Sequence, residues 1–434
     1  MGNWAFAFRA LRARNYRLFF IGQSVSLIGV WMMRVATSWL VYRLTGSSIL
    51  LGVVGFAGQI PTFLLGPVAG VLVDRWDRHR TLVVTQVFLM LQSLAMAGLT
   101  LAGVITPAQI ILLSVVQGVI NSVDMPARQA FVVQMVENRE DLGNAIALNS
   151  SMFNGARLAG PAIAGMVIAA VGEGVCFLLD GLSYVAVIGS LLAMKIQAAP
   201  PRSQRDLLVE IREGWRYVSG SLAIRSLLVM VAVISLFGMP YTVLMPVFAA
   251  NVLGGGPNTL GFLMAATGMG ALGGGILLAM RRSVLGLGKQ IVFAILTFGG
   301  SLIVFGLSSN LWLSLFVLAV SGYGMIQQMA GTNTILQTIV DEEKRGRVMS
   351  FYTMAFMGAA PFGSLLAGAL SDRIGAPWTV VVCGLVCLAG GGWLARKLPA
   401  IRREIRPIYI QLGILPEVAA GVQQASTLQT PPQN

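Results

Sequence analysis

Long apolar runs and short polar stretches alternate along the chain. A helix needs about 20 mostly apolar residues to cross a bilayer. Runs of that kind predict membrane spans at 18–42, 49–73, 81–105, 108–130, 142–170, 174–194, 223–249, 259–280, 290–307, 311–334, 348–370 and 376–395. The pattern therefore predicts an all-α membrane protein with twelve transmembrane helices.

A polar stretch after the sixth run divides the spans into two equal sets. We expect an N-terminal six-helix bundle over residues 1–194, a cytoplasmic linker over 195–221 and a C-terminal six-helix bundle over 222–396. Residues 397–434 contain Pro, Gln and Ala without a sustained apolar period, which predicts a disordered cytoplasmic tail.

The two sets repeat small residues in the same order. Because Gly and Pro are common in membrane helices, each match alone carries little weight. Their shared order predicts two pseudo-symmetric bundles, an arrangement typical of transporters that rock two halves around a central site. Leu51-Gly52 matches Leu260-Gly261, Gly118 matches Gly322, and Gly160-Pro161 with Gly165 matches Pro361 with Gly363 and Gly368.

Composition and charge placement bear on the surroundings of the chain. Charged residues make up 11% of the 434 positions, compared with roughly 25% in soluble domains, so lipid is the expected solvent. The net charge is +13. Most basic residues fall on the membrane side that holds both termini, in segments 9–17, 75–80, 195–225, 281–289, 344–347 and 396–406 and at Arg139. The opposite side has Arg43 and Arg373. The positive-inside rule then predicts cytoplasmic termini in a cell inner membrane, an uncleaved first helix and no nucleic-acid partner.

Residues that carry catalytic chemistry are sparse. His79 is the only histidine, and Cys176, Cys383 and Cys387 lie in apolar runs as expected for packing residues. The sequence has no metal-ligand spacing, no nucleophile motif and no phosphate-binding loop ending in Lys-Ser or Lys-Thr. It therefore argues against an enzyme and predicts no cofactor and no metal.

The loop between the second and third spans has the most specific pattern in the sequence. It reads Gly70-Val-Leu-Val-Asp74-Arg75-Trp-Asp77-Arg78-His-Arg80 and closely resembles the cytoplasmic signature loop of the major facilitator superfamily. Segments 13–29, 121–132 and 141–165 resemble the branch of that superfamily that contains the enterobactin exporter and multidrug efflux carriers. The resemblance covers roughly residues 9–396 and implies that the chain transports small molecules; Asp77 departs from the usual glycine.

Asp74 is suited to a gating latch. Its carboxylate can face the positive N-terminal end of a neighbouring helix, which by repeat symmetry is the eleventh span near Val348, and Gly70 would permit close approach there. A loop that is merely solvated is the alternative. The resemblance implies that Arg78, in a basic cluster with Arg75 and Arg80, bridges to an acid in the fourth span, which here is Asp124.

Charged residues inside the predicted spans cost about 2.5–3.5 kcal/mol each at the bilayer centre, so they should pair or face a water-filled cavity. Arg128 can pair with Asp124 one turn away. Because the first span lines the central cavity in the superfamily, Arg34 is a candidate to contact an anionic substrate or to tune a nearby acid, with snorkelling as the alternative. Arg157 either lines the cavity or braces neighbouring spans, and Asp180 is the best proton-binding candidate.

Two further groups of residues are candidates for the transport path. Gly160, Pro161 and Gly165 in the fifth span resemble the antiporter motif that marks exporters in the superfamily, which favours export. Gln327 and Gln328 in the tenth span either line the substrate cavity or bond to neighbouring helices.

The leading hypothesis is a monomeric secondary active transporter that exports an amphipathic small molecule, such as a drug, siderophore or metabolite, by alternating access and proton antiport. A lipid or lysophospholipid carrier of the same fold and a non-transporting membrane sensor or scaffold are the alternatives. The latch residues and the charged candidates inside the spans, Asp124, Arg128, Arg34, Arg157 and Asp180, all lie in the first half, so we expect gating and proton coupling in the N-terminal bundle.

Overall fold

The computed structural model describes residues 9–135, 141–194, 207–281 and 283–414, without the side chains of Asp74, Val133 and residues 207–211. The regular structure in these ranges is helical. Twelve of the described helical segments are long and apolar enough to cross a membrane. The predicted fold class, an all-helical membrane protein with twelve spans, is therefore confirmed.

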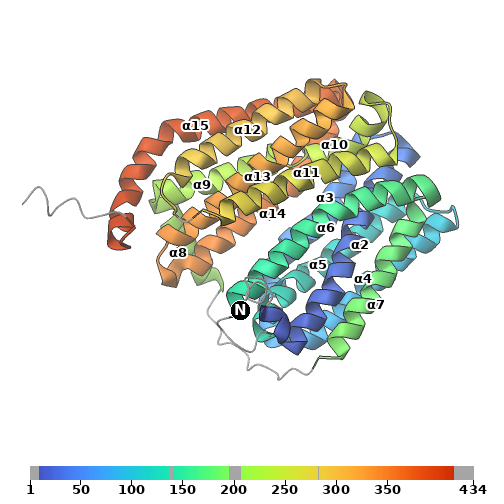
Figure 1. The fold of residues 1–434 in the computed structure, drawn as a ribbon, viewed down its shortest axis with the longest axis horizontal. Helices are drawn as coiled ribbons and strands as arrows, with labels where there is room; N and C mark the ends of the chain where they lie inside the picture. Colours follow the sequence, from blue (N-terminus) through green and yellow to red (C-terminus); the bar gives the residue numbers. More distant parts are fainter. Residues whose placement is uncertain (1–8, 136–140, 195–206, 282, 415–434) are drawn as a thin grey trace, which may run out of the picture.

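The first six spans form one bundle, seen at the lower right of Figure 1. In it α2 packs against α6 and α7, α3 packs against α5, and α4 packs against α5 and α7. A short 3-10 helix, η1 (Arg9–Arg12), precedes them. The spans are α2 (Arg14–Thr45), α3 (Ser48–Arg75), α4 (Arg78–Leu101), α5 (Pro107–Met135), α6 (Leu142–Val171) and α7 (Glu173–Leu192).

The last six spans form the second bundle, and the seventh span is interrupted. That span consists of α9 (Leu222–Val233), the π-helical turn η3 (Ile234–Gly238), α10 (Tyr241–Val247) and a second π-helical turn η4 (Phe248–Val252). Pro240 and Pro246 lie next to these turns, where a missing backbone donor favours irregular helix. The other spans are α11 (Pro257–Ala279), α12 (Leu287–Leu307), α13 (Leu311–Ile339), α14 (Glu342–Ile374) and α15 (Ala376–Gln411).

Several helices extend beyond the apolar runs that predicted them. α13 ends at Ile339 instead of residue 334, and α14 begins at Glu342 instead of residue 348. Apolar patterning ends with the hydrocarbon, but a helix can continue in polar sequence, and acids such as Glu342 and Glu343 in the first turn favour it. α15 likewise continues to Gln411 with Ile401 and Ile405 buried. The expectation of disorder is therefore wrong for residues 398–411, and residues 415–434 lie outside the described ranges.

The two bundles meet through two equivalent helix pairs, α3 with α14 and α6 with α11. A Cβ atom on Gly52 would stand 3.1 Å from Cα of Gly368, and one on Gly261 would stand 3.0 Å from Cα of Gly165. Because any side chain would separate these backbones, small residues permit the close approach. Gly52 and Gly261 are the residues that the sequence matched between the halves, so the pseudo-symmetry appears directly at the interface.

The bundles converge toward one side of the membrane. We call the side where α2 begins the terminal face and the other side the opposite face. Toward the opposite face, Asn251 Nδ2 donates to Tyr42 Oη at 2.6 Å, and the rings of Phe56 and Phe362 meet edge to face at 5.8 Å. Figure 1 shows the bundles approaching each other at the right and diverging toward the lower left, which is the terminal face.

Candidate functional site

Two arginines of the N-terminal bundle converge on one tryptophan. Cζ of Arg34 in α2 lies 4.8 Å from the centroid of the Trp31 ring, and Cζ of Arg157 in α6 lies 5.9 Å from it. The ring of Phe153 contacts the same indole edge to face at 5.8 Å. Arg34 lies deep within the protein, yet its side chain is exposed. It therefore faces open space between packed helices, as expected for a residue of a transport cavity.

Arg157 reaches the boundary between the bundles. Its Nη2 lies 3.8 Å from the sulfur of Met325 in α13, and it is within electrostatic range of Tyr241 in α10. The Tyr241 hydroxyl is buried close to Thr267 but makes no hydrogen bond of ordinary length and angle. The cluster of Trp31, Arg34, Arg157 and Tyr241, which we call the central site, is thus formed by both bundles.

Neither arginine of the central site has a carboxylate partner among the described residues. Arg34 and Arg157 are instead close enough to repel each other. The ion pairs found in the described ranges are Arg9–Asp141, Arg43–Glu173, Arg128–Asp124, Lys344–Asp341 and Arg347–Glu213. The central site is therefore a concentration of positive charge at membrane depth.

Asp180 lies in the interior of the N-terminal bundle. Its side chain is completely buried in α7, and Ser93 Oγ in α4 donates to Oδ2 at 2.5 Å. The other oxygen, Oδ1, has no hydrogen-bond partner and faces the backbone of Gly29 in α2. No cation pairs with this carboxyl in the part of the chain that the structure describes, so it differs from the other buried acids.

Asp124 forms the ion pair expected from its spacing to Arg128. Arg128 Nη2 lies 2.5 Å from Asp124 Oδ2, while Oδ1 accepts hydrogen bonds from Thr85 Oγ1 and Gln86 Nε2, both at 2.7 Å. The acid is almost fully buried, and these partners all belong to α4 and α5. The network links α4 and α5 in the halves of these two helices that lie toward the terminal face.

The signature loop closes α3 onto α4. Asp77, the residue that departs from the superfamily pattern, caps α4 because its Oδ1 accepts from the Arg80 backbone N–H at 2.9 Å. Arg75 and Arg80 are exposed, and Arg78 is half-buried. The side chain of Asp74 lies outside the described residues.

Gly70 does not mediate a close helix contact in this conformation. A Cβ atom placed on Gly70 would meet open space. The named contacts between α3 and α14 reach only as far as Phe63 and Gly358, near the middle of both helices. The close packing expected at Gly70 is not formed in this state, in which the terminal ends of the bundles are apart, and it stays a prediction for the closed state.

Gln327 and Gln328 do not face the transport cavity. Gln327 is buried; its Oε1 accepts from Gln290 Nε2 in α12 at 2.6 Å, and its Nε2 donates to the Gly274 carbonyl in α11 at 2.9 Å. Gln328 is also buried, with Nε2 only 3.5 Å from Thr332 Oγ1. Gln327 therefore bonds to the neighbouring helices α11 and α12, the second of the two alternatives. Gln328 contacts Thr332 of its own helix, and its Oε1 has no hydrogen-bond partner.

The small residues of the fifth span lie at two different interfaces. Gly165 contacts α11 across the bundle boundary, whereas Gly160 faces α2, where its Cβ would stand 2.5 Å from Cβ of Trp31. Gly160 therefore sets how closely Trp31 approaches the helix that carries Arg157. Pro161 lies between them, buried, with its carbonyl oxygen against Gly261.

Gly160→Ala is expected to displace Trp31, lowering both thermal stability and transport, because overpacking a tight contact costs about 1–3 kcal/mol. Gly155→Ala is the matched control, since Gly155 lies on the same helix with open space where its Cβ would be. The melting temperatures of the purified variants and their transport rates check this. Equal behaviour of the two variants would show that the Gly160–Trp31 contact is unimportant.

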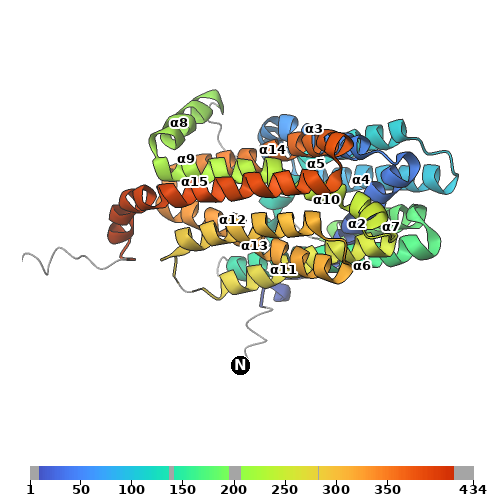
Figure 2. The same ribbon diagram turned by 90° about the horizontal axis from the view of Figure 1, so that it is seen from above.

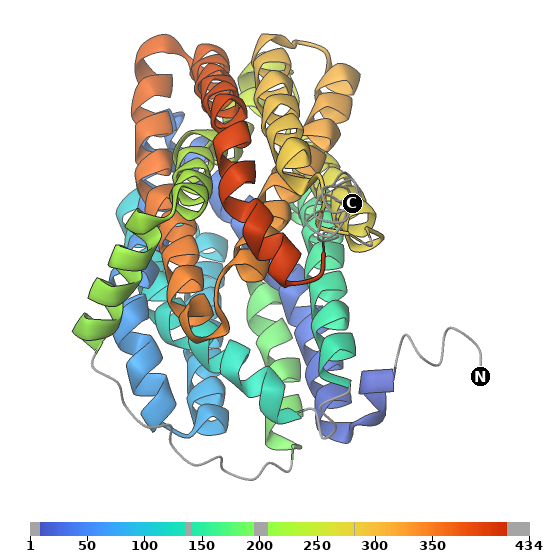
Figure 3. The ribbon, with the colours of Figure 1, turned by 90° about the vertical axis from the view of Figure 1, so that its left-hand side faces the viewer.

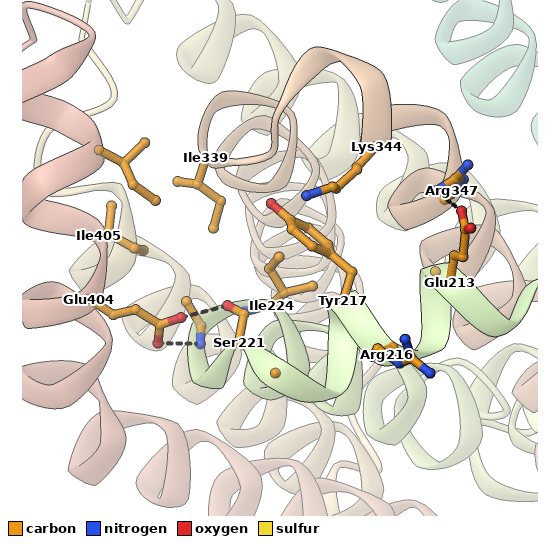
Figure 4. A pocket seen from close by; sticks show the side chains of 14 residues that line it. Glu213, Arg216, Tyr217, Ser221, Ile224, Ile339, Lys344, Arg347, Glu404 and Ile405 are labelled. Carbon is orange, nitrogen blue, oxygen red and sulfur yellow. Dashed lines mark hydrogen bonds and ion pairs between the residues drawn. The ribbon is translucent and has the colours of Figure 1, made fainter. Parts of the chain in front are cut away.

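A separate cavity of about 560 Å³ lies at the terminal face (Figure 4). It is enclosed by α8 (Leu207–Gly220), α9, α14 and the extension of α15; Figures 2 and 3 show α8 at the edge of the C-terminal bundle, beside these helices. Glu213 of α8 pairs with Arg347 of α14 at 2.7 Å, and Glu404 accepts from Ser221 Oγ at 2.7 Å and the Ala223 N–H at 3.0 Å. These bonds fasten the linker helix to the C-terminal bundle.

Within this cavity Lys344 lies over the Tyr217 ring at 4.6 Å. Burial, reinforced by the negative charge of Asp341, raises the pKa of Tyr217. The phenol therefore stays neutral, and its ring remains available to the lysine. The residues that line the cavity belong to the linker helix and the C-terminal bundle, and their bonds hold these helices together, so we assign the cavity a structural role.

Sequence reasoning missed three partners of the candidate residues: Trp31, Ser93 and Tyr241. The contact of Trp31 with Arg34 could have been predicted from the sequence, because Trp31 lies three residues before Arg34 and residues at that spacing share a helix face. Ser93 and Tyr241 belong to spans other than those of Asp180 and Arg157, so only the helix packing brings them together.

Comparison with known proteins places this geometry in a family. The sequence model of the family described as transmembrane secretion effector matches residues 5–409. The chain is 26% identical to a staphyloferrin A transporter of Staphylococcus aureus, with 86% of this chain and 94% of that protein covered. It is 27% identical to the multidrug efflux pump Tap of Mycolicibacterium fortuitum (85% and 91% covered) and 23% identical to macrolide efflux protein A of Streptococcus pyogenes (89% and 95% covered).

Solved structures share the fold at low sequence identity. A bacterial homologue of the human lysosomal transporter Spinster, in an inward-facing and unoccupied conformation, has a TM-score of 0.71 at 12% identity, covering 90% of this chain and 98% of that one. A bacterial homologue of the iron transporter ferroportin, in an inward-facing state, has a TM-score of 0.68 at 15% identity, covering 88% and 98%. These similarities show the fold of major facilitator transporters.

Proposed function

The chain belongs to the transmembrane secretion effector family of the major facilitator superfamily, and on this premise we propose that it exports an amphipathic small molecule by alternating access, driven by proton entry. Its relatives and fold are those of efflux transporters and not of enzymes. The observation that carries the proposal is the central site. Arg34 is exposed at membrane depth, beside a bundle boundary that is closed toward the opposite face.

In the proposed orientation the terminal face is cytoplasmic and the protein is a monomer in the cell inner membrane. The basic residues that flank the spans gather at the terminal face, as the positive-inside rule requires. The structure would then be open toward the cytoplasm, ready to accept a molecule for export. Relatives whose names specify a siderophore, macrolides and multiple drugs support a drug, siderophore or metabolite as substrate.

Proton coupling is assigned to Asp180. An ionised carboxylate is costly in an apolar interior unless a cation pairs with it, and Asp180 has only the Ser93 hydroxyl. Binding a proton removes that cost, and losing the proton favours a rearrangement of α2, α4 and α7, which surround the group. Asp124 is already paired with Arg128, so it is assigned to the gate.

In the gating part of the proposal, Asp74 engages the start of α14 when the terminal face closes. The positive end of the α14 dipole favours a carboxylate there, and the open space at Gly70 is where α14 would approach. Arg75, Arg78 and Arg80 complete the proposed cytoplasmic latch.

Everted membrane vesicles containing the protein test the direction of transport. Energised by ATP, they are expected to accumulate at least one of a panel of amphipathic fluorophores, such as ethidium, Nile red and pyrenebutyrate, because export from the cell is uptake into an everted vesicle. Vesicles without the protein are the control. Accumulation only in right-side-out vesicles would contradict export and indicate uptake into the cell. Accumulation of no fluorophore and no fluorescent lysophospholipid would favour a non-transporting scaffold.

A further inference from the structure

The positive charge of the central site is not neutralised by the described part of the chain. An unpaired arginine at the bilayer centre is costly, and Arg34 and Arg157 also repel each other. Both share the electron-rich face of Trp31, but a cation–π contact offsets only part of that cost. A negative partner that is present for part of the transport cycle would resolve this imbalance.

The surroundings of the two guanidinium groups indicate the shape of that partner. Trp31 and Phe153 present flat apolar surface next to the cations, and Phe153 is 47% exposed, so its ring is available for contact. On the other side of the bundle boundary, Tyr241 holds a buried hydroxyl without an ordinary hydrogen bond. A ligand that suits these groups combines an anionic head with a flat apolar body.

We propose that the transported molecule is an organic anion whose carboxylate or similar group binds between Arg34 and Arg157, with its apolar body against Trp31 and Phe153. Guanidinium groups bind such oxyanions in charge-assisted, bidentate geometry. This inference rests on the proposed function and narrows its substrate class: neutral and cationic amphiphiles are poor substrates, because they leave both arginines unpaired.

Arg157 connects the central site with the C-terminal bundle, so binding of an anion at the site can affect that bundle. Its guanidinium touches Met325 of α13 and acts on Tyr241 of α10, both in the C-terminal bundle. An anion bound to Arg157 neutralises a positive charge at the boundary between the bundles. This boundary must open toward the opposite face for the substrate to leave on that side. Occupancy therefore favours the rearrangement that releases the substrate on that side.

A matched series of ligands tests the charge preference directly. Pyrenebutyrate, pyrenebutyramide and pyrenebutylamine share one aromatic body and differ in head-group charge. Binding to the full-length protein in lipid nanodiscs is measured by fluorescence anisotropy. We expect the carboxylate to bind at least about tenfold more tightly than the amide, since hydrogen bonds to charged groups contribute about 1.5–3 kcal/mol, and the amine to bind most weakly. Equal affinities, or no binding of the carboxylate, overturn the inference.

Arginine variants then place the preference at the central site. Arg34→Gln and Arg157→Gln are each expected to remove most of the tenfold preference of the carboxylate over the amide, and Arg34→Lys is expected to restore part of it. Arg373→Gln, which removes an exposed arginine near the opposite face, is the matched control. Melting temperatures verify that the variants are folded. If the preference survives both glutamine variants, the anion binds elsewhere and the inference is wrong.

The outcomes for binding and for export can be told apart. Export of pyrenebutylamine as fast as pyrenebutyrate overturns the anion inference while the exporter proposal stands. A charge preference in nanodiscs that depends on Arg34, without uptake into everted vesicles, supports the anion site and counts against the proposed function.

Discussion

Asp180→Asn is expected to abolish the uphill accumulation of substrate in energised everted vesicles, down to the level of vesicles without the protein. Asparagine has the same shape and can accept the Ser93 hydrogen bond, so the N-terminal bundle should remain folded. It cannot gain or lose a proton, however, and behaves as a permanently neutral acid. Because the carboxyl is completely buried and lacks a cation partner, its charge is the property that the substitution removes.

The same variant should still carry out exchange without a gradient. Counterflow of labelled for unlabelled substrate requires alternating access but no net proton movement, so we expect it to persist in Asp180→Asn. Asp372→Asn, which changes an exposed carboxyl near the opposite face, is the control and should accumulate substrate normally. Full accumulation by Asp180→Asn would show that the proton binds elsewhere.

Asp74→Asn is expected to abolish efflux while the protein remains in the membrane. Without the carboxylate, the closed terminal face loses its charge interaction with the start of α14, and such an interaction contributes about 0.3–1 kcal/mol at exposed sites and up to about 2 kcal/mol when partly buried. The open state shown here would then predominate. Efflux from cells and the amount of protein in the membrane fraction are the measurements.

Asp77→Asn is the matched control for the latch, because it makes the same change three residues later in the same loop. Asn is as good a helix cap as Asp, and the role of Asp77 is to cap α4, so efflux should be retained. A cysteine at Gly66, which lies one turn before Gly70 on the same helix face and where a Cβ atom would meet open space in the open state, reports the gate: maleimide labelling should rise in Asp74→Asn. Normal efflux with unchanged labelling would refute the latch.

The sequence was sufficient to predict the fold because membrane spans are encoded locally. Every predicted span corresponds to an observed helix, and α6 begins at Leu142 as predicted. The errors lie where helices leave the hydrocarbon, as at Glu342 and Gln411, because apolar length records the thickness of the bilayer and not the length of the helix. The matched glycines Gly52 and Gly261, which indicated the repeat, lie at the symmetric contacts between the bundles, where close packing requires small residues.

The candidate site was only partly predictable, because its pairings depend on how helices are rotated. The Asp124–Arg128 pair follows from i, i+4 spacing within α5. Convergence of Arg34 and Arg157 on Trp31 involves two helices more than a hundred residues apart, and no local pattern encodes it. Gln327 shows the converse: its polarity suggested the cavity, but rotation of α13 points its amide at α11 and α12.

The most direct test of proton-driven export is collapse of the pH gradient in everted vesicles. Vesicles energised by ATP have an acidic interior, and an antiporter loads substrate as protons leave. Once a fluorophore has accumulated, nigericin in potassium buffer removes the pH gradient. We predict prompt release of the fluorophore, and no such accumulation with Asp180→Asn in place of the wild-type protein. Accumulation that persists when valinomycin is added with nigericin, which removes the membrane potential as well, would contradict proton coupling.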